Sequence, residues 1–290
     1  MHKSNGIKNT PRVRWENLLP EEFLERQQTL PLVYLPLGMC EPHGHIAPFG
    51  LDTLKAVYLC EEAAKRFGGI VAPTLGYQIH EVGYHAQWLQ RVVGEVEPAM
   101  TSMPPDVMLR FFLYQLRSFY NAGFTSIVVI TGHAGGNEKD YRLVAEAFMK
   151  EISINIIVKA DPELVDGKFN GDHAGKYEIS QLLYLHPELM AMDRMARSKT
   201  DALGQFAQGD NAHEANAELG KNIIEESLLS LGSIIANLPQ QQTSKKLNYQ
   251  ETEKIWQKVL SRKSEWVTAK PRKEQEAVAE TSQWKPYEYY

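Results

Sequence analysis

Short apolar runs alternate along this chain with segments of helical periodicity, and this alternation restricts the possible folds more than any other feature. The apolar runs are PLVYLPLG (31–38), residues 70–75, SIVVITG (126–132) and NIIVKAD (155–161). The helical segments cover residues 20–28, 53–67, 105–122, 138–151, 174–185, 212–236 and 249–266. Strands separated by crossover helices pair in parallel and are covered on both faces. The pattern therefore predicts an α/β fold with a mostly parallel central sheet.

The chain shows no internal repeat and no low-complexity linker that would divide its 290 residues. We therefore expect a single α/β domain over residues 1–266. Residues 267–290 contain two prolines, many charges and several aromatic side chains near the end. Such a tail is either disordered or docked on a neighbouring subunit, and the aromatic side chains favour docking.

Charge and hydropathy restrict the partners. Lys and Arg total 31 against 36 for Asp and Glu, so the basic surface that nucleic acid requires is not expected. No apolar run is long enough to span a membrane, and the N-terminal segment lacks the hydrophobic core of a signal peptide. The two cysteines form neither a disulfide framework nor a CxxC pair. These features predict a cytoplasmic protein with no nucleic-acid or membrane partner.

Side chains of the kinds that bind metal ions occur at predicted strand ends and helix starts. Glu41, His43 and Asp52 lie in EPHGHIAPFGLD, His133 follows the run 126–132, and Glu178 lies in GDHAGKYEIS. Ligands gather at the carboxyl ends of the strands in α/β proteins. Carboxylate and imidazole groups together suit divalent ions such as Zn²⁺, Mn²⁺ or Fe²⁺. The sequence therefore predicts a metal-dependent enzyme.

Each candidate ligand also has a structural interpretation. Asp52 is placed to cap the helix predicted over 53–67, and Glu178 suits a first helical turn because its charge opposes the helix dipole. A lone histidine at a strand end, such as His133, is more often structural than catalytic. The occurrence of all these groups together favours metal binding, because a carboxylate that bridges two cations offsets the repulsion within an acidic cluster.

Two further segments could hold a substrate. Residues 76–98 are rich in glycine, histidine and aromatic residues, and His80, Tyr84 and His85 could form a polar ring there, although an exposed aromatic loop would have the same composition. In TGHAGGN, the glycine turn around Gly135 lets backbone N–H groups approach a ligand closely. Asn137 could cap the helix that follows or hold a substrate carbonyl. The motifs of serine hydrolases, P-loop enzymes and dinucleotide-binding proteins are absent from the sequence.

These motifs resemble those of the creatininase (creatinine amidohydrolase) family. The family's E-x-H-G segment, with an aspartate eleven residues after the glutamate, matches residues 41–44 and Asp52. Its GHGGN motif matches residues 132–137 with one residue extra, and its HAGxxETS motif matches residues 173–180. A later pattern of Gly-Asp followed by Ala, Glu and Gly matches positions within 209–220. The resemblance spans about residues 31–220.

The resemblance implies a three-layer α/β/α fold, a hydrolase centre with one or two divalent metal ions per subunit, and a homo-oligomer, commonly a hexamer. By position, Glu41, Asp52 and His133 would bind one ion. His43, the bridging Asp52 and a further carboxylate would bind the other.

The further carboxylate needs a substitute in this chain. Creatinine-cleaving members carry it two residues after the histidine of their glycine-rich motif, where this sequence has Gly135. We expect Glu178 to take that place rather than Glu138. The resemblance also implies that His173 is the acid/base that gives a proton to the leaving group, so His173 and Glu178 are the expected catalytic residues.

Departures from the family pattern occur where a substrate would be recognised. Pro42 replaces a glutamine, His45 comes one residue early, and the segment after His80 lacks the family's FPGT stretch. We therefore expect a hydrolase that opens a small polar cyclic substrate with metal-activated water, at a C–N amide bond. One alternative is a metal-dependent C–C bond hydrolase that opens a cyclic diketone or an oxidised inositol ring. Another is a non-catalytic binding protein of the same fold.

Overall fold

The computed structural model describes residues 12–79, 100–196, 206–241, 245–269 and 281–282. Within these ranges, four parallel strands form the central sheet in the order β2-β1-β5-β6. Their bounds are β1 Leu32–Leu37, β2 Ile70–Val71, β5 Ser126–Thr131 and β6 Asn155–Ala160. A separate parallel pair consists of β3 (Gln78–Ile79) and β4 (Ser102–Met103).

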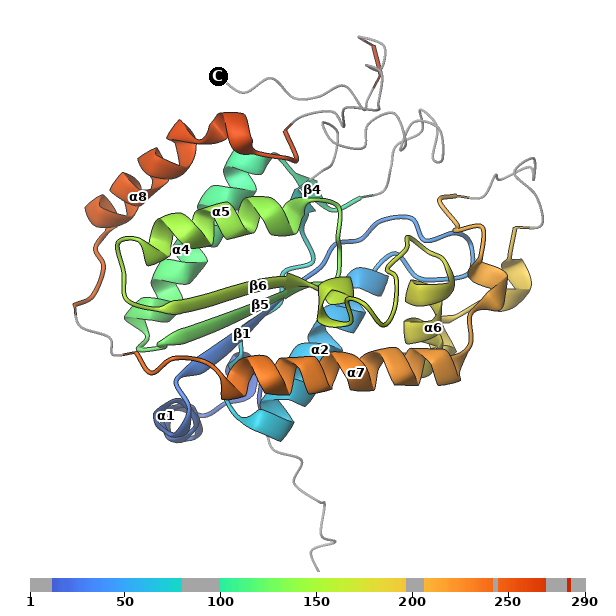
Figure 1. Cartoon of the computed structure of the whole chain (residues 1–290), viewed down its shortest axis with the longest axis horizontal. Coiled ribbons are helices and arrows are strands. Elements are labelled where there is room, and N and C mark those ends of the chain that lie inside the picture. The colour runs from blue at the N-terminus through green and yellow to red at the C-terminus, as the bar shows by residue number, and fades with distance from the viewer. Residues whose placement is uncertain (1–11, 80–99, 197–205, 242–244, 270–280, 283–290) are drawn as a thin grey trace, which may run out of the picture.

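Helices cover both faces of the sheet (Figure 1). One face packs against α2 (Leu51–Phe67) and α7 (Ala217–Ala236), with α6 (Lys176–Leu185) beside them. The other face packs against α4 (Pro105–Asn121), α5 (Asn137–Met149) and α8 (Tyr249–Ser261). The first helix, α1, spans Pro20–Thr29. Short 3-10 helices span Trp15–Asn17, Asp161–Leu164, Pro187–Leu189, Met192–Arg194, Ala212–Glu214 and Lys263–Glu265. The expected α/β class, with a mostly parallel sheet between two helical layers, is confirmed.

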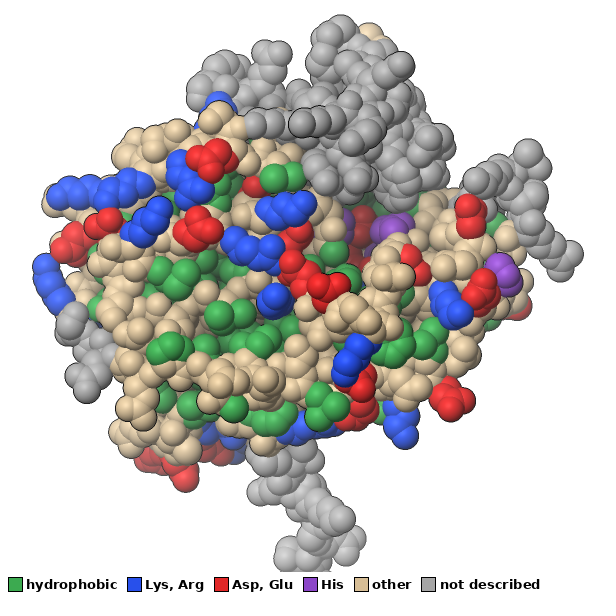
Figure 2. Space-filling view, viewed as in Figure 1, with side chains coloured by type: hydrophobic (Ala, Val, Ile, Leu, Met, Phe, Trp, Pro, Cys, Tyr) green, Lys and Arg blue, Asp and Glu red, His purple; other side chains and the backbone are tan. Residues whose placement is uncertain are grey.

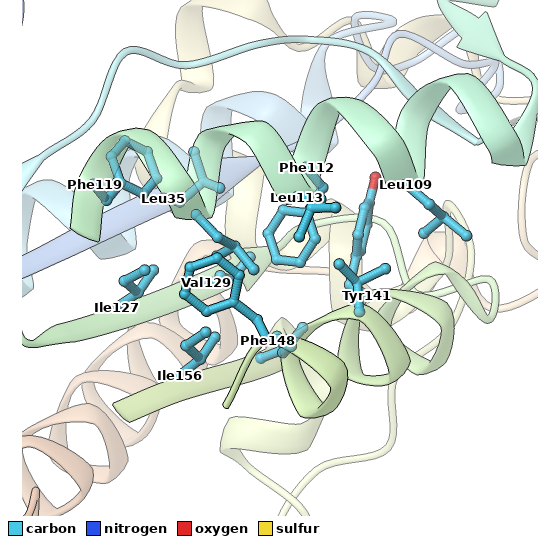
Figure 3. Close-up of a cluster of buried hydrophobic side chains, with 14 of the residues drawn as sticks. Leu35, Leu109, Phe112, Leu113, Phe119, Ile127, Val129, Tyr141, Phe148 and Ile156 are labelled. Atoms are coloured by element: carbon cyan, nitrogen blue, oxygen red, sulfur yellow. The ribbon is translucent and has the colours of Figure 1, made fainter. Parts of the chain in front are cut away.

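The strands of the central sheet are mostly apolar because helices cover both faces of the sheet. Successive side chains of a strand point to opposite faces. In β1, Val33 and Leu35 pack with α4 and α5, whereas Leu32 and Tyr34 pack with α2 and α7. Figure 3 shows the first of these cores, with Leu35 and Val129 of the sheet lying against aromatic and leucine side chains from α4 and α5.

The strand register brings the carboxyl ends of three strands level with one another. Leu37, Thr131 and Ala160 end β1, β5 and β6, and they are paired across the sheet. The loops that follow these strands therefore leave from the same edge. Over the described ranges, no helix is both long and apolar enough to cross a membrane.

Several element bounds differ from the sequence expectation. The strand expected over 70–75 is paired only at Ile70–Val71, with an isolated bridge at Leu75. The helix expected over 212–236 is divided, because the side chain of Asn216 accepts a hydrogen bond from the Leu219 N–H and so begins α7 at Ala217.

The segment after residue 266 is attached to this chain's own α5 at its start. The buried carboxylate of Asp140 accepts hydrogen bonds from the N–H of Val267 (2.7 Å), the N–H of Thr268 (3.0 Å) and the hydroxyl of Thr268 (2.6 Å). Residues 270–280 and 283–290 lie outside the described part of the chain. The single domain over 1–266 and the disordered or docked tail stay predictions.

Replacing Asp140 with alanine is expected to lower the free energy of unfolding by about 3 kcal/mol, because three donors lose a charged acceptor. Urea unfolding followed by circular dichroism measures this change. Glu146→Ala is the matched control, since Glu146 also lies on α5 and pairs with Arg262 at 3.2 Å, but on an exposed surface. Its loss is expected to change stability by less than ~1 kcal/mol. Equal losses in the two variants would contradict the anchoring role of Asp140.

Candidate metal centre

The candidate ligands lie in loops and helix starts at the edge of the sheet where β1, β5 and β6 end. Glu41 and His43 follow β1, His133 follows β5, Asp52 is the second residue of α2, and Glu178 is the third residue of α6. All of these side chains are buried. Histidine and acidic side chains gather on one part of the face shown in Figure 2.

Two glycines let the start of α2 approach the strand ends. A Cβ atom at Gly38, after β1, would lie 2.4 Å from the backbone N and Cα of Thr53. A Cβ atom at Gly132, after β5, would lie 2.0 Å from the carbonyl oxygen of Asp52. Only glycine permits this contact, so the position of Asp52 in the cluster requires glycine at both positions.

Glu41, Asp52 and His133 form the first group with metal-binding geometry. His133 Nδ1 lies 2.7 Å from Glu41 Oε1 and 3.4 Å from Asp52 Oδ2. One ligand atom from each of the three side chains lies within 4.8 Å of the others. This spacing allows the three residues to coordinate one ion.

His43, Asp52 and Glu178 form a second group. His43 Nε2 lies 3.4 Å from Asp52 Oδ1 and 3.5 Å from Glu178 Oε2. Their ligand atoms also lie within 4.8 Å of one another. Asp52 therefore presents one oxygen to each group, which is the arrangement of a carboxylate that bridges two cations.

The unsatisfied atoms of the cluster fit divalent ions. Among the described residues, neither carboxylate oxygen of Asp52 nor Nε2 of His43 has a hydrogen-bond partner. Buried polar atoms without partners are rare in folded proteins, and metal coordination is one way to satisfy them. His43 Nδ1 lies 3.0 Å from the carbonyl oxygen of Glu41, and donation there leaves Nε2 as the coordinating nitrogen.

The electrostatics of the cluster keep the carboxylates of Asp52 and Glu178 ionised. Burial alone would raise the pKa of Asp52, but His43, His133 and Lys55 outweigh it and hold that pKa well below its usual value. Burial would lower the pKa of His43, yet the carboxylates, Asp52 foremost, raise it to about 9, so this imidazole has to lose a proton before Nε2 can bind a cation. Burial would also raise the pKa of Glu178, and Lys55 contributes most to lowering it instead. Ionised carboxylates are the form that binds cations.

His173 lies at the margin of the cluster. Its ring stacks on that of His43 with centroids 4.8 Å apart, and its side chain is 24% exposed. His173 Nε2 lies 2.9 Å from the carbonyl oxygen of Pro42, while Nδ1 lies 3.8 Å from Glu41 Oε1. Donation from Nε2 to that carbonyl leaves Nδ1 directed at the cluster, where it can accept or release a proton.

A network of hydrogen bonds aims Glu178 at the cluster. The carboxylate of Asp172 accepts from the N–H groups of Gly175 (3.2 Å) and Tyr177 (2.8 Å), which fixes the first turn of α6. Ala174 adopts a left-handed conformation with φ of 49°. Its N–H donates to Glu178 Oε2 at 2.8 Å. Hydrogen bonds at the first turn of α6 therefore fix the position of the Glu178 carboxylate.

A family model described as creatininase, creatinine amidohydrolase, matches residues 16–235 and includes every candidate ligand. The chain belongs to the creatininase family. One curated relative of this creatininase-family chain is the 3-dehydro-scyllo-inosose hydrolase of Thermotoga maritima. The two sequences are 25% identical over 191 residues, and the alignment covers 61% of this chain and 58% of that protein. The chain is also 26% identical over 183 residues to the creatinine amidohydrolase of Pseudomonas putida, covering 57% of this chain and 68% of that protein.

The fold is shared with solved creatininases. A crystal structure of creatinine amidohydrolase superposes with a TM-score of 0.64 at 23% identity, over 78% of this chain and 97% of that one. The three-layer α/β/α architecture expected of the family is therefore present. The alignment covers less than two thirds of the inosose hydrolase.

The structure also tests two structural interpretations of the candidate residues. Asp52 does not cap α2, because the helix begins at Leu51 with Gly50 at the capping position. Asn137 does not cap α5, because it is the first residue of that helix and Gly136 precedes it. The buried side chain of Asn137 instead accepts a hydrogen bond from the N–H of Ile79 at 3.0 Å and so holds β3.

The remaining candidates divide into described and undescribed residues. Gly135 is buried and lies between His133 and the start of α5. Glu138 accepts from the N–H of Gly136 at 3.0 Å and belongs to none of the metal-binding groups found among the described residues. His80, Tyr84 and His85 lie outside the described residues.

Sequence reasoning missed Lys55 and Asp161. Lys55 Nζ lies 2.5 Å from Glu178 Oε1, 3.3 Å from Asp161 Oδ1 and 3.7 Å from Asp52 Oδ1. Two signals were present in the sequence. Lys55 lies four residues from Leu51 and from Leu59, so a lysine occupies the apolar row of an amphipathic helix. Asp161 directly follows the run that forms β6, at the edge where the ligands gather.

Proposed function

We propose that this chain is a metal-dependent hydrolase that opens a small polar cyclic substrate at a C–N amide bond. The observation that carries the proposal is the position of Asp52, whose two oxygens are directed to His133 and to His43 in a buried cluster with Glu41 and Glu178. The similarity to a creatinine amidohydrolase supports an amide as the bond that is broken.

One or two divalent ions per subunit would be held by the two groups that share Asp52. Glu41 and His133 complete one group, and His43 and Glu178 complete the other. When bound, such ions supply a Lewis acid that acidifies water and polarises a carbonyl group. Solved creatininase structures include a manganese form and a zinc form, so Mn²⁺ and Zn²⁺ are the first ions to test, followed by Fe²⁺.

The chain's own residues move the proton and hold the developing charge. His173 presents Nδ1 to the cluster, so it can transfer a proton to the departing nitrogen, while Glu178 stays ionised beside it. The N–H of Gly136 already donates to Glu138. We therefore assign stabilisation of the oxyanion within this turn to the N–H of Gly135.

Substrate contacts are proposed for the chain that follows β3. Asn137 holds that strand through Ile79, and the chain continues directly into His80, Tyr84 and His85. We propose that these three side chains contact a polar ring and that Asn137 contributes to the same wall. Alanine replacements that leave KM unchanged for the best substrate found would overturn this assignment.

Removal of divalent ions is expected to lower hydrolysis by at least ~100-fold, since the Lewis acid and the acidified water are both lost. The chelator-treated protein is assayed on a panel of lactams, cyclic ureides and formamides, before and after addition of Mn²⁺, Zn²⁺ or Fe²⁺. Plasma mass spectrometry follows the metal content. Undiminished turnover by the stripped protein would contradict the proposed function.

A second candidate is hydrolysis of a C–C bond in a cyclic diketone or an oxidised inositol ring. The similarity to a 3-dehydro-scyllo-inosose hydrolase favours it. Adding cyclic diketones and inosose-type ketones to the same panel separates the two candidates. Turnover of these ketones without turnover of any amide would favour C–C cleavage, and the reverse pattern would exclude it.

Assembly and location are proposed on the resemblance and the sequence. We expect a homo-oligomer, with a hexamer as the family's common form, in the cytoplasm. Light scattering that gives the mass of a single chain would overturn the oligomer, and fractionation that recovers the protein outside the cytoplasm would overturn the location.

A further inference from the structure

Lys55 is a charged side chain buried behind the candidate metal centre. It extends from α2 between Leu51 and Leu59 and has no exposed surface. A buried ammonium group is unfavourable unless it is paired with carboxylates. Burial would lower the pKa of Lys55, but Asp161, Glu178 and Asp52 outweigh it and raise that pKa, so the group is cationic.

The two carboxylate oxygens of Glu178 face different partners, Lys55 on one side and His43 on the other. Glu178 Oε1 lies 2.5 Å from Lys55 Nζ. Glu178 Oε2 accepts from the N–H of Ala174 and lies 3.5 Å from His43 Nε2. The carboxylate is therefore held from both sides, and one oxygen remains directed at the group formed with His43 and Asp52.

Asp161 supports Lys55. Its Oδ1 lies 3.3 Å from Lys55 Nζ, and its Oδ2 accepts from the side-chain amide of Gln181 at 3.2 Å. Asp161 belongs to none of the metal-binding groups detected in the described ranges. Asp161, Lys55 and Glu178 thus form a chain of contacts that ends at the metal centre.

The opposite charges of Lys55 and Asp161 leave the net charge of the site unchanged when both are present. Their contribution to an ion bound nearby is then mainly geometric, because the attraction of one charge is largely offset by the repulsion of the other. Supporting residues of this kind orient a ligand, and their loss typically weakens metal binding 10–100-fold.

We propose that Lys55, supported by Asp161, is a positioning residue for the ion that His43, Asp52 and Glu178 would hold. Lys55 holds Glu178 so that a single carboxylate oxygen would coordinate that ion. The inference rests on the proposed function, since it requires the cluster to bind two divalent ions.

The test replaces both charges at once. Lys55→Met combined with Asp161→Asn keeps the net charge and the approximate volume of the site, and it leaves no lone buried charge from this pair. The full chain is stripped of metal and titrated with Mn²⁺, with free Mn²⁺ measured by electron paramagnetic resonance. We expect two ions per chain in the unmodified protein. In the double variant one ion, held by Glu41, Asp52 and His133, stays within about 3-fold of its affinity. The other ion, held by His43, Asp52 and Glu178, binds about 10–100-fold more weakly.

Two further variants separate positioning from general damage. Lys55→Gln with Asp161→Asn keeps a donor to Glu178 and is expected to recover part of the affinity that the Lys55→Met double variant loses. Lys65→Met with Glu62→Gln neutralises a solvent-accessible pair on the same helix, 2.8 Å apart, and is expected to bind both ions as the unmodified protein does.

Each contrary outcome has a distinct meaning. Wild-type affinity for both ions in the Lys55/Asp161 double variant would overturn the inference, and so would equal weakening of both ions. A single ion in the unmodified protein would overturn the inference but leave a one-ion hydrolase. No bound Mn²⁺, Zn²⁺ or Fe²⁺ in the unmodified protein would overturn the proposed function itself.

Discussion

Asp52→Asn is expected to lower kcat/KM by about 1,000-fold or more and to reduce the bound metal to less than one ion per chain. Asp52 presents Oδ2 to His133 and Oδ1 to His43, so it belongs to both candidate ion sites. An asparagine keeps the shape of the side chain but loses the negative charge, and its amide nitrogen cannot coordinate a cation. The remaining amide oxygen can serve only one of the two sites, so one site loses a ligand atom and both lose a negative charge. Metal analysis and the rate on the best substrate of the panel measure the effect.

Asp106→Asn is the matched control for this experiment. Asp106 is the second residue of α4, as Asp52 is the second residue of α2, and both helices contain 17 residues. Its replacement removes only a favourable charge at a helix N-terminus, worth up to about 1 kcal/mol, and should leave metal content unchanged. Full metal occupancy and full activity in Asp52→Asn would show that Asp52 is no ligand, and the two-site interpretation would then fail.

Gly132→Ala is expected to lower the free energy of unfolding by about 3 kcal/mol or more and to weaken metal binding at the same time. A Cβ atom at this position would lie 2.0 Å from the carbonyl oxygen and 2.7 Å from the carbonyl carbon of Asp52. These are backbone atoms, so no side-chain rotation relieves the clash. The start of α2 has to move away from β5, and that movement carries Asp52 away from His133. Thermal or urea unfolding and Mn²⁺ titration of the same preparation measure the two effects.

Gly50→Ala provides the comparison, since Gly50 also lies at the start of α2 but a Cβ atom there meets no heavy atom within 4 Å. Its φ of −85° is accessible to alanine. We expect a loss of no more than about 1 kcal/mol, from the weaker helix-capping preference of alanine, and unchanged metal affinity. If Gly132→Ala proved as stable as Gly50→Ala, the close approach of α2 to β5 would not require glycine at position 132.

Much of the fold could be predicted because it depends on local patterns. The apolar runs that form β1, β5 and β6 were placed to within one or two residues at each end, and their alternation with helices implied the parallel sheet. The weaker run after Ile70 was overestimated, since most of it lies beyond the paired part of β2. Pairing of an edge strand depends on its neighbour's length and path, which local periodicity does not contain.

The ligand-type residues could also be recognised from the sequence, because carboxylate and imidazole groups at strand ends are unusual enough to stand out. The alternative interpretation of Asp52 as a helix cap is excluded, whereas the preferred interpretation as a metal ligand stays a prediction. Gly38 and Gly132 permit the start of α2 to lie against the strand ends, and the helix begins one residue before Asp52. Its side chain is thereby turned into the cluster instead of toward its own helix.

By itself, the sequence determined which segments form strands and helices and which side chains are chemically able to bind cations, because both follow from residue type and periodicity. Only the tertiary structure decided which oxygen of Asp52 faces which histidine, and that Lys55 is buried against Glu178, a residue 123 positions away. Such contacts depend on how α2 and α6 pack at the edge of the sheet. The sequence shows that a lysine lies among apolar helix positions, but its ion-pair partner can be identified only from the packing of the two helices.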